Sequence, residues 1–83
     1  MALGNRSHSE GDKTVAMGPY THAEGCSSLK LPDTIKVDTS DLDIINTWNA
    51  ISGNNKFSLA KGDASHTEGK DNLALGKYSH AEG

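Results

Sequence analysis

Four copies of one five-residue motif carry the residues of this sequence that could do chemistry. Each copy reads Ser or Thr, then His, a small residue, Glu and Gly, and the copies stand at 7–11, 21–25, 65–69 and 79–83. Imidazole and carboxylate groups both bind metal ions, and histidine or glutamate can also serve as a general base. The motif therefore raises three alternatives: a metal site, a catalytic pair or a structural repeat.

The spacing of the motif favours a structural repeat. Gly11 and Gly25 are 14 residues apart, and so are Gly69 and Gly83. A second half-unit precedes each motif, as "ALG" at 2–4, "VAMG" at 15–18, "LAKG" at 59–62 and "LALG" at 73–76. A glycine about every seven residues argues against a helix, whereas short alternating runs that end in glycine are typical of strands and turns. We therefore expect each 14-residue unit to form two strands and two turns, and stacked units to form a narrow β-solenoid.

Side chains alternate along a strand, so the motif residues divide between two faces. Thr21, Ala23 and Gly25 share one face, and His22 and Glu24 share the other. The small residues must lie inside, because a coil of two strands is too narrow for larger ones. Two outward faces remain. The first, called here the His–Glu column, comprises His8, Glu10, His22, Glu24, His66, Glu68, His80 and Glu82. The second, called the apolar face, comprises Leu3, Val15, Met17, Leu59, Leu73 and Leu75.

The apolar face predicts self-association. A contiguous apolar surface on the outside of a thin solenoid marks an interface, and a single coil buries too little surface to offset the chain entropy. We expect copies of the chain to associate through the apolar face, with cyclic symmetry as the simplest closed arrangement. This argument leaves the number of copies open.

The repeats also resemble a known family. "TVAMG…THAEG" and "NLALG…SHAEG" resemble the head repeats of trimeric autotransporter adhesins, the YadA-like β-roll, and the His–Glu version is similar to repeats in phage and prophage tail proteins. The resemblance implies an all-β fold, namely a left-handed parallel β-roll of 14-residue coils in an intertwined or side-by-side homotrimer. It also implies a location at the cell surface, outside the cell or on a virion, as a segment of a longer protein that carries anchor and stalk segments.

An insertion at 32–55 separates repeats at 1–31 from repeats at 56–83. Within it, 34–38 alternates like a strand. The stretch 39–53 resembles a capped helix, with Thr39 or Ser40 as N-cap and Gly53 as its end. We expect this strand-plus-helix excursion either to pack its apolar side on the roll or its symmetry mates, or to bind a partner. Trp48 is the largest anchor for either role.

The His–Glu column favours a structural role over metal binding or catalysis. It is open, repetitive and solvent-facing, whereas a dedicated metal site has a closed set of ligands. We therefore expect no metal and no cofactor, and His8, His22, His66 and His80 are the candidate ligands should an ion bind. Ser79 and His80 are neighbours on a strand and point to opposite faces, so they cannot form a nucleophile–base pair. We expect no enzymatic activity.

The composition argues against nucleic acid as a partner and against a membrane span. A net charge of −3 with interspersed signs offers no basic patch for nucleic acid, and no run of 18 apolar residues could span a membrane. The resemblance implies a fibrous trimeric attachment module, an adhesin head or a tail-fibre segment, that binds a host cell-surface or extracellular-matrix ligand by multivalent contact. The alternative is a purely structural spacer or trimerisation segment with no ligand of its own.

Overall fold

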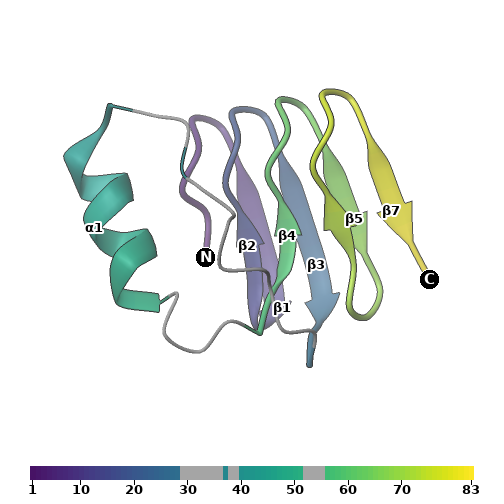
Figure 1. Ribbon diagram of the computed structural model, residues 1–83. Helices are drawn as coiled ribbons and strands as arrows, with labels where there is room; N and C mark the ends of the chain where they lie inside the picture. Colours follow the sequence, from purple (N-terminus) through teal and green to yellow (C-terminus); the bar gives the residue numbers. More distant parts are fainter. Residues whose placement is uncertain (29–36, 38–39, 52–55) are drawn as a thin grey trace.

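The computed structural model describes residues 1–28, 37, 40–51 and 56–83. Within these residues the chain forms short strands and one helix (Figure 1). In chain order they are β1 (His8–Asp12), β2 (Thr14–Ala16), β3 (His22–Cys26), α1 (Leu42–Ile51), β4 (Ser58–Ala60), β5 (His66–Glu68), β6 (Leu73–Ala74) and β7 (His80–Glu82). No helix in this part of the chain is long and apolar enough to cross a membrane.

The strands form two sheets in which every neighbouring pair is parallel. One sheet has the order β1-β3-β5-β7 and the other β2-β4-β6, so consecutive strands of the chain belong to different sheets. Figure 1 shows the strands of each sheet following one another across the molecule in chain order, with α1 beside them. The expectation of a strand-rich structure with one short helix is confirmed.

The strand register follows the sequence repeat. His8 pairs with His22 and His66 pairs with His80, each pair being 14 residues apart. His22 pairs in turn with His66, although the insertion separates them in the sequence. The repeats on the two sides of the insertion therefore belong to one continuous stack.

Small residues fill the space between the sheets, as the alternation predicts. Ala16, Ala23 and Ala60 come from both sheets, form one cluster and have no exposed surface. Ser58 and Thr67, at matching inward positions, are also fully buried. Because the interior accepts only small side chains, larger apolar residues must lie on the outside of the sheets.

In three of the four motif copies, the final glycine is required by the close approach of the backbone in the next layer. Gly25 has a φ of 114°, a left-handed value that residues with a side chain rarely adopt. A Cβ at this position would also collide with the backbone oxygen of Gly69 in the next layer. The prediction that the motif glycine forms a corner is confirmed.

Helix α1 begins one residue after its capping side chain. The Asp41 carboxylate accepts hydrogen bonds from the backbone N–H groups of Asp43, at 2.9 Å, and Ile44, at 3.4 Å. The prediction of Thr39 or Ser40 as N-cap is wrong, because the helix starts later and aspartate caps as well as serine or threonine. The predicted helix end at Gly53 lies outside the described residues, as does the predicted strand at 34–38 apart from Val37.

The insertion packs on the apolar face. Trp48 is only 7% exposed and lies with its ring centroid 6.3 Å from that of Phe57. Both belong to a core cluster with Val15, Met17 and Leu59, and this cluster is extended at its margin by Leu3, Val37 and Leu73. The helix side chain thus covers the centre of the apolar face, whereas Leu75 is 51% exposed.

Candidate functional site

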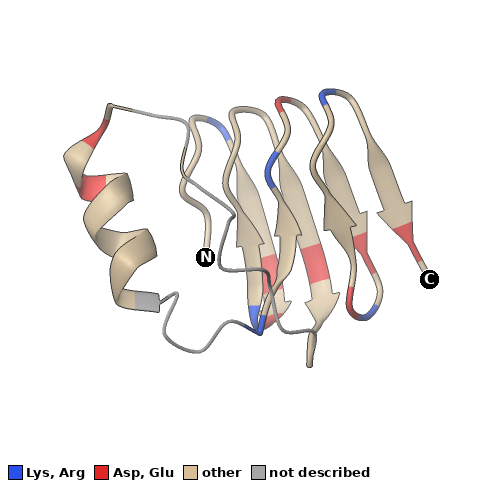
Figure 2. Ribbon diagram, viewed as in Figure 1, with Lys and Arg blue, Asp and Glu red and all other residues tan. Residues whose placement is uncertain are grey.

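The His–Glu column lies on the outer face of the sheet β1-β3-β5-β7. Histidine is the first residue of each of these strands and glutamate the third, so both point to the same side. Parallel pairing places each residue beside its counterpart in the next layer. Figure 2 shows acidic residues, in red, recurring from strand to strand across the sheet.

The four imidazoles stack along this face. Ring centroids are 4.9 Å apart for His8 and His22, 4.6 Å for His22 and His66, and 4.7 Å for His66 and His80. These spacings match the separation of about 4.8 Å between hydrogen-bonded strands. The central pair is nearly parallel, with an interplanar angle of 6°, whereas the outer pairs are tilted by 46° and 27°.

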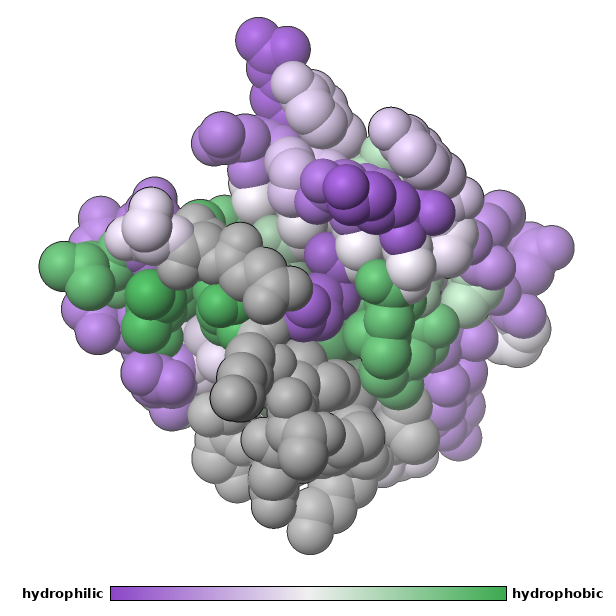
Figure 3. Space-filling model, turned by 45° about the horizontal axis from the view of Figure 1, so that its top comes forward, coloured by the Kyte–Doolittle hydropathy of each residue, from purple (hydrophilic) through white to green (hydrophobic). Residues whose placement is uncertain are grey.

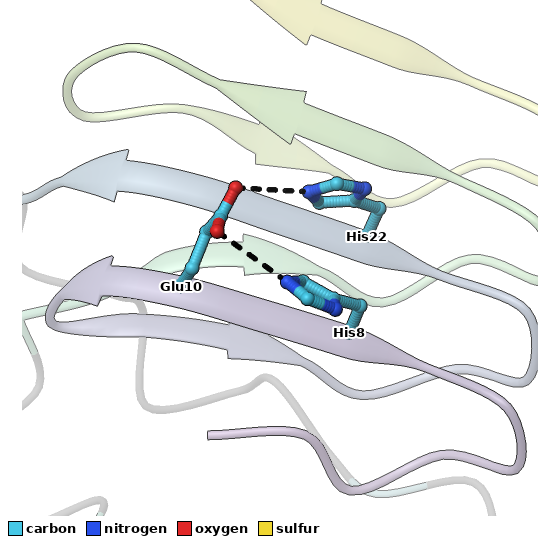
Figure 4. Close-up of side chains that lie close together, drawn as sticks. All are labelled: His8, Glu10 and His22. Carbon is cyan, nitrogen blue, oxygen red and sulfur yellow. Dashed lines mark ion pairs between the residues drawn. The ribbon is translucent and has the colours of Figure 1, made fainter.

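Three of the glutamates each lie between two histidines. In the first layer, the Glu10 carboxylate is 3.5 Å from Nε2 of His8 and 3.8 Å from Nε2 of His22 (Figure 4). Glu24 repeats this arrangement at 3.4 Å from His22 and 3.9 Å from His66. Glu68 does so at 3.7 Å from His66 and 3.4 Å from His80, and Glu82 lies 3.9 Å from His80.

The inner imidazoles have nitrogen atoms with no hydrogen bond. The side chains of His22 and His66 are 37% and 35% exposed, yet their Nε2 atoms are hidden from solvent and make no hydrogen bond. The carboxylate oxygens around them lie farther away than the 2.7–2.9 Å or so of a charge-assisted hydrogen bond. In the column, imidazole nitrogen and carboxylate oxygen atoms therefore lie close together without forming optimal hydrogen bonds.

The two ends of the column differ electrostatically. Interactions with the neighbouring Glu24 carboxyl group, and then with the His8 imidazole, lower the pKa of Glu10. A hydrogen bond with Glu68, together with the repulsion of its charge, raises the pKa of Glu82. Neighbouring carboxyl groups thus interact at both ends of the column, because the strand register sets like groups side by side.

The described residues contain three clusters that could hold a metal ion. Each consists of two histidines and one glutamate whose ligand atoms lie within 4.8 Å of one another. The clusters are His8–Glu10–His22, His22–Glu24–His66 and His66–Glu68–His80. The sequence indicated the four histidines and the pairs formed by adjacent repeats. It did not reveal the middle cluster, which depends on the pairing of β3 with β5 across the insertion.

The hydroxyl groups of the motif serve the turns. Ser7, Thr21 and Ser79 donate hydrogen bonds to the carbonyl oxygens three residues earlier, at 2.7, 2.7 and 2.6 Å. Turn formation therefore explains the Ser or Thr in three of the four motif copies, whereas the hydroxyl of Ser65, in the remaining copy, is buried without a hydrogen bond.

The remaining site residues lie elsewhere. Trp48 is a residue of α1 and its side chain is buried in the core, so a ligand contact through its ring would require the helix to move. Sequence reasoning missed Tyr20 and Tyr78, which are 60% and 81% exposed at equivalent turn positions, both with a φ of 60°. In the sequence, these two tyrosines could have been identified because tyrosine recurs immediately before the motif in two of its copies. Cys26 is a free, exposed thiol.

Comparisons of the chain with protein-family models, with curated proteins and with solved structures found no match.

Proposed function

We propose that this chain is a segment of a fibrous homotrimer, built on a left-handed parallel β-roll, that attaches to a host cell surface or matrix by multivalent contact. The observation that carries the proposal is the in-register stacking of 14-residue units in two parallel sheets around a small-residue interior. The sequence resemblance to YadA-like head repeats supplies the handedness, the trimer and the surface or virion location.

The part of the apolar face that α1 leaves uncovered supports assembly. Leu75 is 51% exposed, and Leu3 and Leu73 are only partly buried. Groups of hydrophobic side chains, bordered by hydrophilic ones, lie at the surface in Figure 3. Val15, Met17 and Leu59 are already buried within the chain. In this proposal, the trimer contact uses the margin of the apolar face, and the insertion serves as part of the scaffold.

Tyr20 and Tyr78 support the attachment role. The residue before each motif copy has a positive φ, at Arg6, Tyr20, Ala64 and Tyr78, so this conformation belongs to the repeated turn. The two tyrosines present large, rigid aromatic rings at the turns, and Arg6 lies over the Tyr20 ring at 5.9 Å from its centroid. Aromatic residues and arginine are the groups that dominate binding energy at interfaces. A trimer would present each tyrosine three times, so that weak contacts add as avidity.

The solution mass of the wild-type chain and of a Leu75→Glu variant tests the assembly. We expect a trimer for the wild type and dissociation for Leu75→Glu, because a charge would be buried at the contact. Leu42→Glu is the matched control, since Leu42 is 70% exposed on α1 and lies outside the apolar face. A wild-type monomer, or equal effects of the two variants, would contradict the proposal.

Binding to intact host cells separates attachment from the alternative, a spacer without a ligand. We expect a Tyr20→Ala/Tyr78→Ala double variant to remain trimeric and to lose surface binding. If neither binds, the spacer function is favoured; if both bind equally, the chain attaches through residues other than the two tyrosines.

A further inference from the structure

We propose that the His–Glu column binds divalent first-row transition cations, with Zn²⁺ as the representative ion, in sites made of two histidines and one glutamate. This inference does not depend on the proposed function, because all the ligands of a site come from one chain. Imidazole nitrogen and carboxylate oxygen are ligands that such ions accept together.

The separations between ligand atoms favour an ion over hydrogen bonds. Ligands at about 2.0–2.2 Å from a tetrahedral ion lie about 3.4 Å from one another. In the first cluster, the Glu10 oxygens are 3.5 and 3.8 Å from the Nε2 atoms of His8 and His22. In the last cluster, Glu68 lies 3.7 and 3.4 Å from His66 and His80. These distances exceed an optimal hydrogen bond and need only small shifts to fit a shared ion.

The inner histidines provide a second, independent observation. The Nε2 atoms of His22 and His66 are hidden from solvent without any hydrogen bond. A buried polar atom without a partner destabilises the folded chain, so the folded chain gains stability when a partner is supplied. A cation would supply a ligand bond to Nε2 and would also reduce the repulsion between neighbouring carboxylates. The backbone register already holds the ligands together before an ion arrives, which lowers the cost of binding.

Ring orientation indicates which clusters are filled. His22 and His66 are nearly parallel, at 6°, so their lone pairs run side by side instead of converging on one ion. The outer pairs are tilted by 46° and 27°. Their terminal members, His8 and His80, have side chains 63% and 51% exposed, which leaves these rings free to rotate toward an ion. The outer clusters are therefore the better sites.

Sharing of ligands limits the stoichiometry. The middle cluster uses Nε2 of His22 and of His66, and each of these atoms also belongs to one outer cluster. Since one Nε2 atom binds one ion, the middle cluster cannot be filled together with either outer cluster. The column accordingly takes two ions per chain, one at His8–Glu10–His22 and one at His66–Glu68–His80.

Equilibrium dialysis of the metal-free chain against ZnCl₂, with the bound zinc counted by elemental analysis, tests the proposal. We expect saturation at two ions per chain for the wild type and for Glu24→Gln, and at one ion for Glu10→Gln and for Glu68→Gln. The His22→Ala/His66→Ala variant should bind none at the column. Circular dichroism of each variant checks that it is folded, and the near-isosteric Glu→Gln series keeps the test valid if the histidine variant unfolds.

Cobalt provides a second readout besides the count. Co²⁺ bound by these ligands in a tetrahedral site should give an intense visible absorption, which is lost in the histidine double variant. The proposal is overturned if the wild type shows no saturable binding, if the folded His22→Ala/His66→Ala variant binds as many ions as the wild type, or if Glu24→Gln loses as much binding as Glu10→Gln.

Discussion

The apolar face and the His–Glu column are produced by the same repeat, and they differ in what the chain places over them. On the apolar face, Val15 and Leu59 have no exposed surface because the Trp48 and Phe57 side chains pack with them. None of the described residues covers the column in this way, and its side chains remain 32–67% exposed. The apolar face is thus largely buried within the chain, whereas the His–Glu column remains at the surface.

The difference between the two faces shows that in-register parallel stacking favours some residue types at a strand position and disfavours others. Each side chain lies beside its own counterpart in the next layer, as Leu59 does beside Leu73 and His22 beside His66. Stacked apolar residues reinforce one another, whereas stacked carboxylates repel. Alternating glutamate with histidine along the strand sets an imidazole beside every carboxylate, which reduces that repulsion and gathers metal ligands at the same time.

Gly25→Ala should give the largest effect, because it disturbs the corner on which both faces depend. A methyl group at φ 114° is strained, and it would collide with the backbone oxygen of Gly69. We expect the free energy of unfolding to fall by about 4 kcal/mol, or folding to be lost. Urea denaturation measures the change. Gly76→Ala is the control, since the nearest atom to its Cβ, in Ser79, is at 4.0 Å. Equal effects of the two variants would contradict the corner assignment.

Trp48→Ala should weaken the packing on the apolar face without disturbing the His–Glu column. Removing a side chain that is only 7% exposed leaves a cavity beside Phe57, and we expect a loss of about 3 kcal/mol in unfolding free energy. Leu42→Ala, at a position 70% exposed, should change stability by less than about 0.5 kcal/mol. Zinc binding by folded Trp48→Ala should be unchanged, and a loss of it would show that the two faces are coupled.

Ala64→Gly changes a turn that belongs neither to the apolar face nor to the His–Glu column, so it tests the strain of the turn separately from both faces. Ala64 has a φ of 55°, a left-handed value that costs alanine about 1–2 kcal/mol. Glycine removes this strain but makes the unfolded chain more flexible, so we expect a net gain of about 0.5 kcal/mol. Ala50→Gly, on the exposed side of α1, should instead cost about 1 kcal/mol. A destabilising Ala64→Gly would contradict the strain argument.

The smallest effects concern pH and the two ends of the column. The pKa of Glu82 is raised, so its contribution to stability is present at low pH and is lost as the pH rises through that pKa. The pKa of Glu10 is lowered, so its contribution is present above the ordinary value of 4.5 and is lost as the pH falls through the lowered pKa.

Urea midpoints of Glu82→Gln and Glu10→Gln at pH 7 and pH 3 measure these contributions. In metal-free buffer at pH 7, Glu82→Gln should be slightly more stable than the wild type and Glu10→Gln slightly less stable. Both differences should shrink at pH 3. Differences of the same sign for the two variants would show that the ends of the column are equivalent.

Much of the fold could be predicted because the repeat encodes it directly. Alternation predicted the alanine interior and the outward histidines, and recurrent glycine predicted the corners. The position of the insertion could not be predicted in this way, since the cover over Val15 and Leu59 depends on where α1 returns to the sheets. The N-cap was misassigned because Thr39, Ser40 and Asp41 are all good caps in succession. The continuous column also required knowledge that β5 pairs with β3, which no local pattern reveals.

Native mass spectrometry of the chain in ZnCl₂ tests the central claim, that the apolar face assembles the chain and the His–Glu column binds cations. The account predicts a species of three times the 8.8 kDa chain mass that carries two zinc ions per chain. The His22→Ala/His66→Ala variant should retain the trimer mass without zinc in the column. A single chain of 8.8 kDa without bound zinc would contradict both the assembly through the apolar face and the cation binding by the His–Glu column.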